Sequence, residues 1–177
     1  MKAIFLDRDG TIIVDKVYLH KHEDSEFEKN AIEGLKLLQQ NFSLFIVTNQ
    51  SGVGRNIFSE DAFFKFNKEL LKKCASQGIF FKKVFYCLHK PEDGCSCRKP
   101  KIGMVSEFLR NNEIDLENSF MIGDKPSDIK FGETLGVKSI LLRTGEKDKS
   151  HNHSINPVFV ANNMLEAAIF IKENTIL

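Results

Sequence analysis

The sequence predicts a doubly wound α/β fold, a Rossmann-like three-layer sandwich with a mainly parallel sheet. Two observations predict it. Short runs that are apolar throughout alternate with longer segments of helical period, and polar residues suited to catalysis follow directly after the apolar runs. Runs without polar alternation are typical of strands that are buried on both faces of a parallel sheet. The alternation of strand and helix predicts helices on both sides of that sheet.

The predicted strands are the apolar runs, each four or five residues long. The tail 158–174 adds one more strand and a closing helix. The five runs are residues 3–6, 44–48, 84–87, 119–123 and 139–143.

The predicted helices fill the intervals between these runs. Residues 59–78 begin with Ser-Glu-Asp, a good helix cap, and end at a glycine. The polar segment 144–157 is expected to be a surface loop. The other predicted helices are 28–41, 102–114 and a shorter one at 126–135 that ends near Gly136.

Length and composition indicate a single domain over residues 1–177. This length suffices for one sizeable core and is short for two. A net charge of +1 argues against broad phosphate neutralisation, and hence against a nucleic-acid partner. The first apolar run has four residues, too short for a secretory signal, and no run approaches the ~18–20 apolar residues of a membrane span. We therefore expect a cytoplasmic protein without a membrane partner.

Chemistry-bearing side chains follow four successive predicted strands. In doubly wound folds ligands bind beyond the carboxyl ends of the strands, so these side chains are expected to converge. Carboxylate oxygens suit Mg²⁺, one carboxylate can attack phosphorus, and a second can act as acid and then base. A hydroxyl and a lysine can stabilise charge on the transferring oxygens. The residues are Asp7 and Asp9, then Thr48, then Lys99, then Asp124 and Asp128.

Four stretches of the chain resemble, in order, the four motifs of the haloacid dehalogenase (HAD) superfamily of phosphatases. They are FLDRDGT, VTNQSG, CRKPKIGM and IGDKPSD, and together they span most of the chain. The resemblance implies that Asp7 is the nucleophile and Asp9 the acid/base, and that Thr48 and Lys99 stabilise the phosphoryl group. It also implies a catalytic Mg²⁺ held by the Asp7 carboxylate, the Asp9 and Lys125 backbones and Asp124, with Asp128 in support.

The spacing of the motifs leaves no room for the cap domain that larger members of the superfamily insert. Asp7 and Thr48 are 41 positions apart (48 − 7), and Thr48 and Lys99 are 51 apart (99 − 48). A helix, a strand and a loop largely fill each interval. We expect an open site, a monomer, and specificity carried by loops at roughly 15–23, 50–58 and 88–98.

Three cysteines and a histidine cluster in the segment 87–97 with the pattern C-x-H-x5-C-x-C. Cys87, His89, Cys95 and Cys97 match a structural tetrahedral Zn²⁺ site, which needs no open coordination position. A disulfide is disfavoured in a reducing compartment, and C-x-C lacks the C-x-x-C spacing of redox pairs. The sequence therefore predicts a zinc-binding loop immediately before Lys99.

Within the superfamily, this loop followed by C-R-K-P resembles two families. The heptose-1,7-bisphosphate 7-phosphatases of lipopolysaccharide-precursor synthesis are matched by VTNQSGVGRNIF, RKPKIGM, GDK and RTG. The five residues between His89 and Cys95 look more like the histidinol-phosphate phosphatases. Mg²⁺-dependent removal of the heptose C7 phosphate is the favoured interpretation, and histidinol phosphate stays open as the alternative substrate. A zinc-stabilised binding module without catalysis is the alternative from another class.

The family resemblance implies a set of residues that line a small phosphorylated sugar. Arg98 in particular offers a bidentate fork for the second phosphate or a sugar hydroxyl. The full set is Arg8, Asp15, Lys16, Val17, Tyr18, Asn49, Gln50, Ser51, Arg55 and Arg98.

Overall fold

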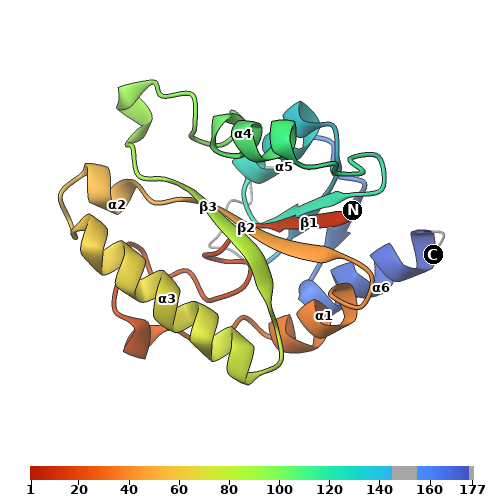
Figure 1. The fold of residues 1–177 in the computed structure, drawn as a ribbon. Coiled ribbons are helices and arrows are strands. Elements are labelled where there is room, and N and C mark those ends of the chain that lie inside the picture. The colour runs from red at the N-terminus through yellow and green to blue at the C-terminus, as the bar shows by residue number, and fades with distance from the viewer. Residues whose placement is uncertain (145–154, 176–177) are drawn as a thin grey trace.

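A six-stranded parallel sheet lies between two layers of helices (Figure 1). The structure is a computed structural model that describes residues 1–144 and 155–175. The strand order is β3-β2-β1-β4-β5-β6, so the chain reverses direction across the sheet between β1 and β4. The strands are β1 (Ala3–Leu6), β2 (Ser43–Asn49), β3 (Phe81–Cys87), β4 (Phe120–Gly123), β5 (Lys138–Leu142) and β6 (Phe159–Ala161).

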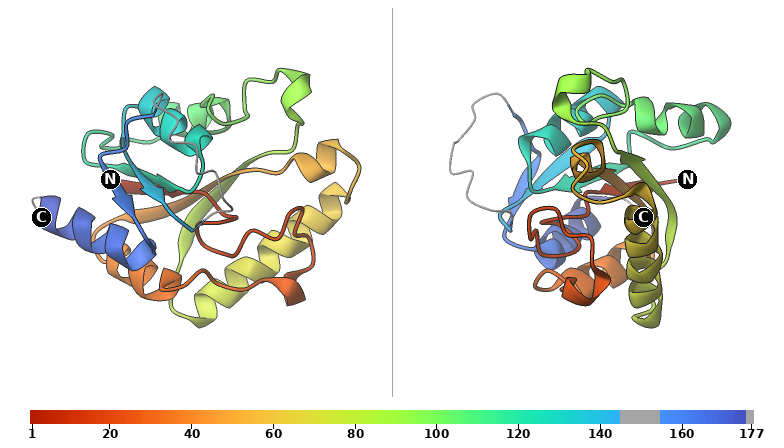
Figure 2. Two further views of the ribbon diagram at one scale, coloured as in Figure 1. Left: turned by 180° about the vertical axis from the view of Figure 1, so that it is seen from behind. Right: turned by 90° about the vertical axis from the view of Figure 1, so that its left-hand side faces the viewer.

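Helices cover both faces of the sheet. In Figures 1 and 2, α1, α3 and α6 lie on one face, and α4 and α5 lie on the other. The helices are α1 (Ala31–Leu38), α2 (Ser51–Gly54), α3 (Glu60–Ser76), α4 (Gly103–Asn111), α5 (Pro126–Leu135) and α6 (Met164–Asn174), with 3₁₀ turns at η1 (His22–Asp24) and η2 (Pro91–Asp93).

Each face of the sheet has its own apolar core, because successive strand side chains point to opposite faces. Phe5 and Phe45 stack with ring centres 5.5 Å apart in the core under α4 and α5. Ile4, Leu6 and Ile46 belong to the larger core under α1, α3 and α6. Each face of the sheet is therefore covered by its own apolar cluster.

The predicted fold class is confirmed, and the element boundaries differ in ways that have physical causes. β3 starts at Phe81, three residues before the predicted run, because it is an edge strand whose Lys82 and Lys83 are exposed. The short helix α2 was not predicted. Most of the polar segment 144–157 lies outside the described residues.

No cap domain is inserted in the described part of the chain. The connections that precede β2, β3 and β4 hold one main helix each, with short helical turns beside it. Over residues 1–144 and 155–175, every helix is too short or too polar to cross a membrane.

Helices α1 and α6 pack closely through a glycine. A Cβ atom placed on Gly34 would lie 2.6 Å from the backbone carbonyl carbon and oxygen of Met164, the first residue of α6. Such a distance is shorter than real Cβ contacts, and a backbone group cannot swing aside. The glycine thus sets the spacing between the two helices.

Gly34→Ala should therefore lower the free energy of unfolding by about 1–3 kcal/mol, although alanine is normally the better helix former. Urea denaturation monitored by circular dichroism would measure the loss. Lys36→Ala, on the exposed side of the same helix, is the control and should leave stability unchanged or slightly higher. A Gly34→Ala protein at least as stable as the parent would show that α1 and α6 can move apart freely.

Candidate active site

The first two carboxylates of the site stand where the strand order reverses. Asp7 follows β1 directly, and its backbone N–H donates to the carbonyl oxygen of Ile122 in β4 (3.0 Å). Asp124 follows β4. The chain turns at Gly10, shortly after Asp7, with a backbone φ of 81°. A Cβ atom at this position would lie 2.4 Å from an Asp124 carboxylate oxygen. The turn residue must be glycine both for its backbone angle and for this close approach.

Lys99 is the buried cation of the site, with only 4% of its surface exposed. Its Nζ donates to Asp7 Oδ1 (2.8 Å) and to the carbonyl oxygen of Val47 (2.7 Å). It also lies 2.7 Å from Asp128 Oδ1. Asp128 Oδ2 in turn accepts from the backbone N–H of Lys125 and caps the start of α5. One ammonium group therefore joins the ends of β1 and β2 to the first turn of α5.

The side-chain charges in this cluster shift one another's pKa values. Burial opposes ionisation of Asp7, but Lys99 and Lys125 outweigh it and lower the pKa of Asp7. At Asp128 burial prevails over Lys99 and raises the pKa. Burial and the charge of Asp7 raise the pKa of Asp124 to about 8. The cluster thus has a surplus of negative charge that a cation would relieve.

Three carboxylates of this cluster can hold a metal ion. One oxygen each from Asp7, Asp124 and Asp128 lie within 4.8 Å of one another. Hard oxygen donors of this kind suit Mg²⁺, which is held in proteins by a few carboxylates and completes its shell with water or substrate oxygens. The residues present therefore fit that ion.

Asp9, the second aspartate after β1, is held by two neighbours. Arg8 donates from Nε to Oδ2 (3.0 Å) and from Nη2 to Oδ1 (3.2 Å). Gln50 donates from Nε2 to Asp9 Oδ2 (2.6 Å) and to Thr48 Oγ1 (2.8 Å). Asp9 and Thr48 are thus connected through one amide group.

Asn49 fixes the backbone of Lys99 from the end of β2. Its Oδ1 accepts from the Lys99 N–H (3.0 Å), and its Nδ2 donates to the Lys99 carbonyl (3.2 Å). This pair of bonds mimics the pairing of a neighbouring strand. It holds the lysine at the position from which its side chain reaches the carboxylates.

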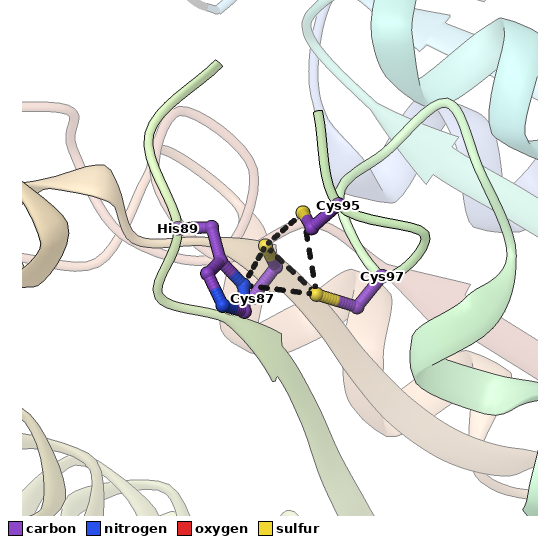
Figure 3. Close-up of side chains that lie close together, drawn as sticks. All are labelled: Cys87, His89, Cys95 and Cys97. Atoms are coloured by element: carbon purple, nitrogen blue, oxygen red, sulfur yellow. Dashed lines mark hydrogen bonds between the residues drawn. The ribbon is translucent and has the colours of Figure 1, made fainter. Parts of the chain in front are cut away.

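The cysteine segment forms a second cluster, shown in Figure 3. Cys87 Sγ lies 3.6 Å from Cys95 Sγ and 3.2 Å from Cys97 Sγ, and the last two sulfurs are 3.5 Å apart. His89 Nδ1 lies 3.7 Å from the Cys87 sulfur and 3.3 Å from the Cys97 sulfur. Ligands on a tetrahedral zinc with bonds of about 2.3 Å are about 3.8 Å apart, so these distances are close to the edges of such a tetrahedron.

The three thiols of this cluster differ in pKa: burial raises the pKa of Cys87 and Cys97, whereas that of Cys95 is lowered. Burial raises the pKa of Cys87 to about 12. At Cys95 burial is outweighed by hydrogen bonds from Cys97 and Cys87, which lower its pKa to about 7. Cys95 therefore ionises near neutral pH, and the thiolate is the form that binds metals. The cluster has the donor set of a zinc site.

Two contacts join the cysteine-containing loop after β3 to α2 and to the residue that follows α2. The backbone N–H of Gly54 donates to the Leu88 carbonyl (3.0 Å), where a Cβ would lie only 2.7 Å from that oxygen. Arg55 pairs with Glu92 at 3.1 Å. The loop after β3 and the loop after β2 therefore form one continuous wall.

A cleft of about 190 Å³ opens above Asp9 at the carboxyl edge of the sheet. A larger apolar groove of about 640 Å³ lies elsewhere, between α3 and β3, and contains none of the aspartates. The cleft is lined by Arg8, Asp9, Asp15, Val17, Tyr18, Leu19, Asn49, Gln50, Ser51, Gly52 and Lys125.

Comparison with known proteins identifies the family. The family model for HAD-hydrolase-like proteins matches residues 96–167. The chain is 42% identical over 147 residues to the D-glycero-alpha-D-manno-heptose-1,7-bisphosphate 7-phosphatase of Campylobacter jejuni, which covers 82% of this chain and 84% of that protein. The chain belongs to the HAD hydrolase superfamily.

Further relatives agree with this assignment. The D-glycero-beta-D-manno-heptose-1,7-bisphosphate 7-phosphatase of Haemophilus ducreyi is 40% identical over 154 residues, 82% of this chain and 85% of that protein. The D,D-heptose 1.7-bisphosphate phosphatase of B. bronchiseptica, solved with magnesium and phosphate, superposes with a TM-score of 0.88 at 26% identity, covering 99% of this chain and all of that one. The HAD chain described here is thus a phosphoric monoester hydrolase.

The HAD fold brings most of the predicted residues together. Asp7, Thr48, Lys99, Asp124 and Asp128 form the buried floor. Seven members of the predicted substrate set line the cleft above it: Arg8, Asp15, Val17, Tyr18, Asn49, Gln50 and Ser51.

Three members of the predicted substrate set lie apart from the cleft lining. Lys16 Nζ bonds to Glu26 (2.6 Å) and to the Asp24 carbonyl. Arg55 pairs with Glu92, and Arg98 donates from Nη1 to the His89 carbonyl (3.2 Å). In this arrangement each of these three cationic side chains is hydrogen-bonded or ion-paired to a neighbouring residue of the protein.

Other residues around the site were missed by sequence reasoning. Asn67 and Phe66, on α3, contact the guanidinium of Arg8. The rings of His20 and Phe58 stack 5.1 Å apart and connect the loop after β1 with the loop after β2. No pattern in the sequence indicates that Phe66 and Asn67 are the partners of Arg8.

The raised pKa of Asp124 predicts a stability effect. The folded chain keeps a proton that the unfolded chain releases above its ordinary pKa of 3.8, so stability falls as pH rises from about 4 to about 8. Asp124→Asn should raise the free energy of unfolding by roughly 2–4 kcal/mol near neutral pH without divalent cations, and should flatten this pH dependence. Urea titrations across that pH range would measure both effects.

Glu107→Gln is a matched control, because it removes the same charge from an exposed position on α4 and should change stability little. If Asp124→Asn were less stable than the parent in magnesium-free buffer, the Asp124 carboxyl would be a net stabilising group and the argument would fail.

Proposed function

We propose that this chain removes the C7 phosphate of D-glycero-D-manno-heptose 1,7-bisphosphate, as a step in the synthesis of nucleotide-activated heptose for lipopolysaccharide. The observation that carries the proposal is the buried Asp7–Lys99–Asp124 cluster beneath a polar cleft, in a chain about 40% identical to phosphatases that bear this substrate's name. The proposed catalytic unit is a single domain over residues 1–177.

Mg²⁺ is the proposed catalytic ion. Asp7, Asp124 and the backbone carbonyl of Asp9 would hold it, together with the backbone of Lys125 and the supporting carboxylate of Asp128. The similar B. bronchiseptica structure, which contains magnesium and phosphate, supports this assignment. When bound, the ion supplies positive charge that neutralises the phosphoryl oxygens.

The proposed reaction has two steps. In the first, an Asp7 carboxylate oxygen attacks phosphorus, the bond between phosphorus and the sugar oxygen breaks, and Asp9 gives its proton to that leaving oxygen. In the second, Asp9 takes a proton from a water, whose oxygen attacks phosphorus. The bond between phosphorus and Asp7 then breaks, and inorganic phosphate leaves with the aspartate regenerated.

Lys99 and Thr48 are positioned to assist both steps. The bond from Lys99 to Asp7 Oδ1 limits rotation of the nucleophile, so its carboxylate is already oriented before the phosphate arrives. Thr48 Oγ1 accepts from Gln50, which leaves its own hydroxyl proton available for a phosphoryl oxygen. These contacts act on charge that develops during transfer.

The sugar and its second phosphate would lie over the cleft residues. Asp15 pairs with Lys125 at 2.9 Å, and this pair offers both an acceptor and a donor to sugar hydroxyls. Arg98 would turn from the His89 carbonyl to the second phosphate, because a bidentate bond to an anion is stronger than a bond to a neutral carbonyl.

Histidinol phosphate is the second candidate substrate. The observation in its favour is the short zinc loop, with five residues between His89 and Cys95. A zinc-stabilised binding module without activity is disfavoured, because such a module would not need a buried lysine among carboxylates.

Side-by-side measurement of kcat/KM on heptose 1,7-bisphosphate and histidinol phosphate, with Mg²⁺, tests the substrate assignment. We expect the heptose substrate to be preferred at least about tenfold. Asp7→Asn should lower kcat on it at least about a thousandfold, because an amide is no nucleophile. Asp61→Asn, an exposed position on α3, should keep full activity. Preference for histidinol phosphate would overturn the substrate, and an active Asp7→Asn protein would overturn the mechanism.

We propose further that Cys87, His89, Cys95 and Cys97 hold a structural Zn²⁺. The closed set of four protein donors leaves no position for a reacting water. The ion would fix the path of the chain just before Lys99. The proposed role of Zn²⁺ is therefore to position the cationic side chains that follow the loop, Lys99 among them.

Cys97→Ser should reduce bound zinc from about one ion per chain to none, lower the melting temperature and reduce kcat. Elemental analysis and thermal denaturation of the purified protein would measure the first two effects. Cys74→Ala is the matched control, since this fourth cysteine is buried in α3 away from the cluster and its loss should leave the zinc in place. A parent protein that is folded and active with no zinc would contradict the assignment.

A further inference from the structure

We infer that Arg8 is a positioning residue that orients the Asp9 carboxylate for proton transfer, and that Asn67 of α3 holds Arg8 in place. The inference rests on the proposed function, in which Asp9 is the acid and then the base. It gives Asn67, which lies on the far side of Arg8 from the cleft, a role in the reaction.

The contact between Arg8 and Asp9 is a two-point clamp. The guanidinium donates from Nε to Oδ2 and from Nη2 to Oδ1, at 3.0 and 3.2 Å. Two parallel bonds fix the plane of the carboxylate as well as its distance. The arginine itself is only 1% exposed, so its head does not swing out to reach substrate.

The other side of the guanidinium is held by α3. Arg8 Nη1 donates to Asn67 Oδ1 (3.2 Å), and Asn67 Nδ2 donates to the Phe63 carbonyl one turn earlier (3.0 Å). That second bond sets which way the amide faces. The Phe66 ring lies 4.5 Å from the guanidinium carbon and supports its flat face. Helix α3 therefore holds the guanidinium of Arg8 on the side away from the cleft.

Gln50 completes the arrangement from the opposite side. Its Nε2 reaches Asp9 Oδ2 at 2.6 Å. The carboxylate is thus held by three N–H donors before any substrate is bound, and Arg8 Nη2 is the donor that reaches Oδ1. Holding the acid/base in a fixed plane reduces the reorganisation needed in each proton transfer.

Burial makes a purely structural role for this pair a poor explanation. Bringing a guanidinium and a carboxylate out of water costs more than packing apolar groups of the same volume. The Phe66 ring packs on the guanidinium, and an apolar residue at position 8 would extend that contact. A charged pair is expected there if the orientation of Asp9 matters to the reaction.

The test compares two substrates whose leaving groups differ in their need for a proton. An alkoxide leaves phosphorus only with a proton from Asp9, whereas 4-nitrophenolate leaves without one. Misplacing Asp9 should therefore slow an alkyl phosphate much more than an aryl phosphate in the first step, which kcat/KM reports. A general loss of folding or of the nucleophile would slow both substrates equally.

The variants are Arg8→Met, Arg8→Lys and Asn67→Leu, assayed with Mg²⁺ on 4-nitrophenyl phosphate and on the alkyl phosphate that the parent hydrolyses best. For Arg8→Met we expect kcat/KM on the alkyl phosphate to fall about 100-fold, and on the aryl phosphate less than about threefold. Arg8→Lys should rescue little, because an ammonium cannot bond Asp9 at two points and Asn67 as well. Asn67→Leu should show the same selective loss, smaller in size.

Lys65→Ala, exposed on the same helix, is the control and should change neither substrate. The double variant Arg8→Met with Asn67→Leu removes both polar partners together, so it should fold even where a single variant does not. Equal losses on both substrates, or an unchanged rate on the alkyl phosphate, would overturn the role of Arg8. A parent that hydrolyses neither substrate would overturn the proposed function and this inference with it.

Discussion

The contact of Lys99 with Asp7 and Asp128 is the interaction on which the site depends. Three carboxylates cannot lie within 4.8 Å of one another in a protein interior unless a cation or a proton compensates them. Lys99 supplies one positive charge, and the raised pKa of Asp124 shows where the remaining excess is absorbed. The surrounding structure positions Lys99 between these carboxylates.

Two separate features of the structure hold Lys99 in place. Asn49 pairs with its backbone from the end of β2, and the cysteine cluster ends two residues before it at Cys97. The same cluster is joined to α2 through the carbonyl of Leu88. A buried charge tolerates little displacement, and this explains why so much of the local structure converges on a single residue.

Much of this was readable in the sequence. Uninterrupted apolar runs such as 3–6 marked parallel strands, and in a parallel sheet the residues that follow each strand must meet at one edge. That argument places Asp7 near Asp124 without any coordinates. The cysteine spacing likewise indicated a single cluster. The boundaries of β3 were missed because an edge strand exposes lysines where a central strand would be apolar.

The orientation of side chains was beyond such reasoning. Lys16, Arg55 and Arg98 were predicted to line the substrate, and only the structure shows that each is paired with a neighbouring carboxylate or carbonyl. Arg8 illustrates the same limit. The family resemblance implied that Arg8 contacts the substrate, while its partner Asn67 lies 59 residues further along the chain. Local patterns do not encode contacts of that range.

The absence of a cap domain from the described chain changes what the substrate itself must do. In a capped enzyme a moving domain excludes water from the reacting phosphate. Here the cleft is lined by the loops after β1 and β2 and by Lys125 after β4, and its roof would be the body of the bound substrate. A molecule too small to cover the cleft would leave its reacting phosphate exposed to water and would react slowly even if that phosphate were correctly placed. The enzyme would then select substrates by size in the catalytic step as well as in binding, and it would do so without a domain movement.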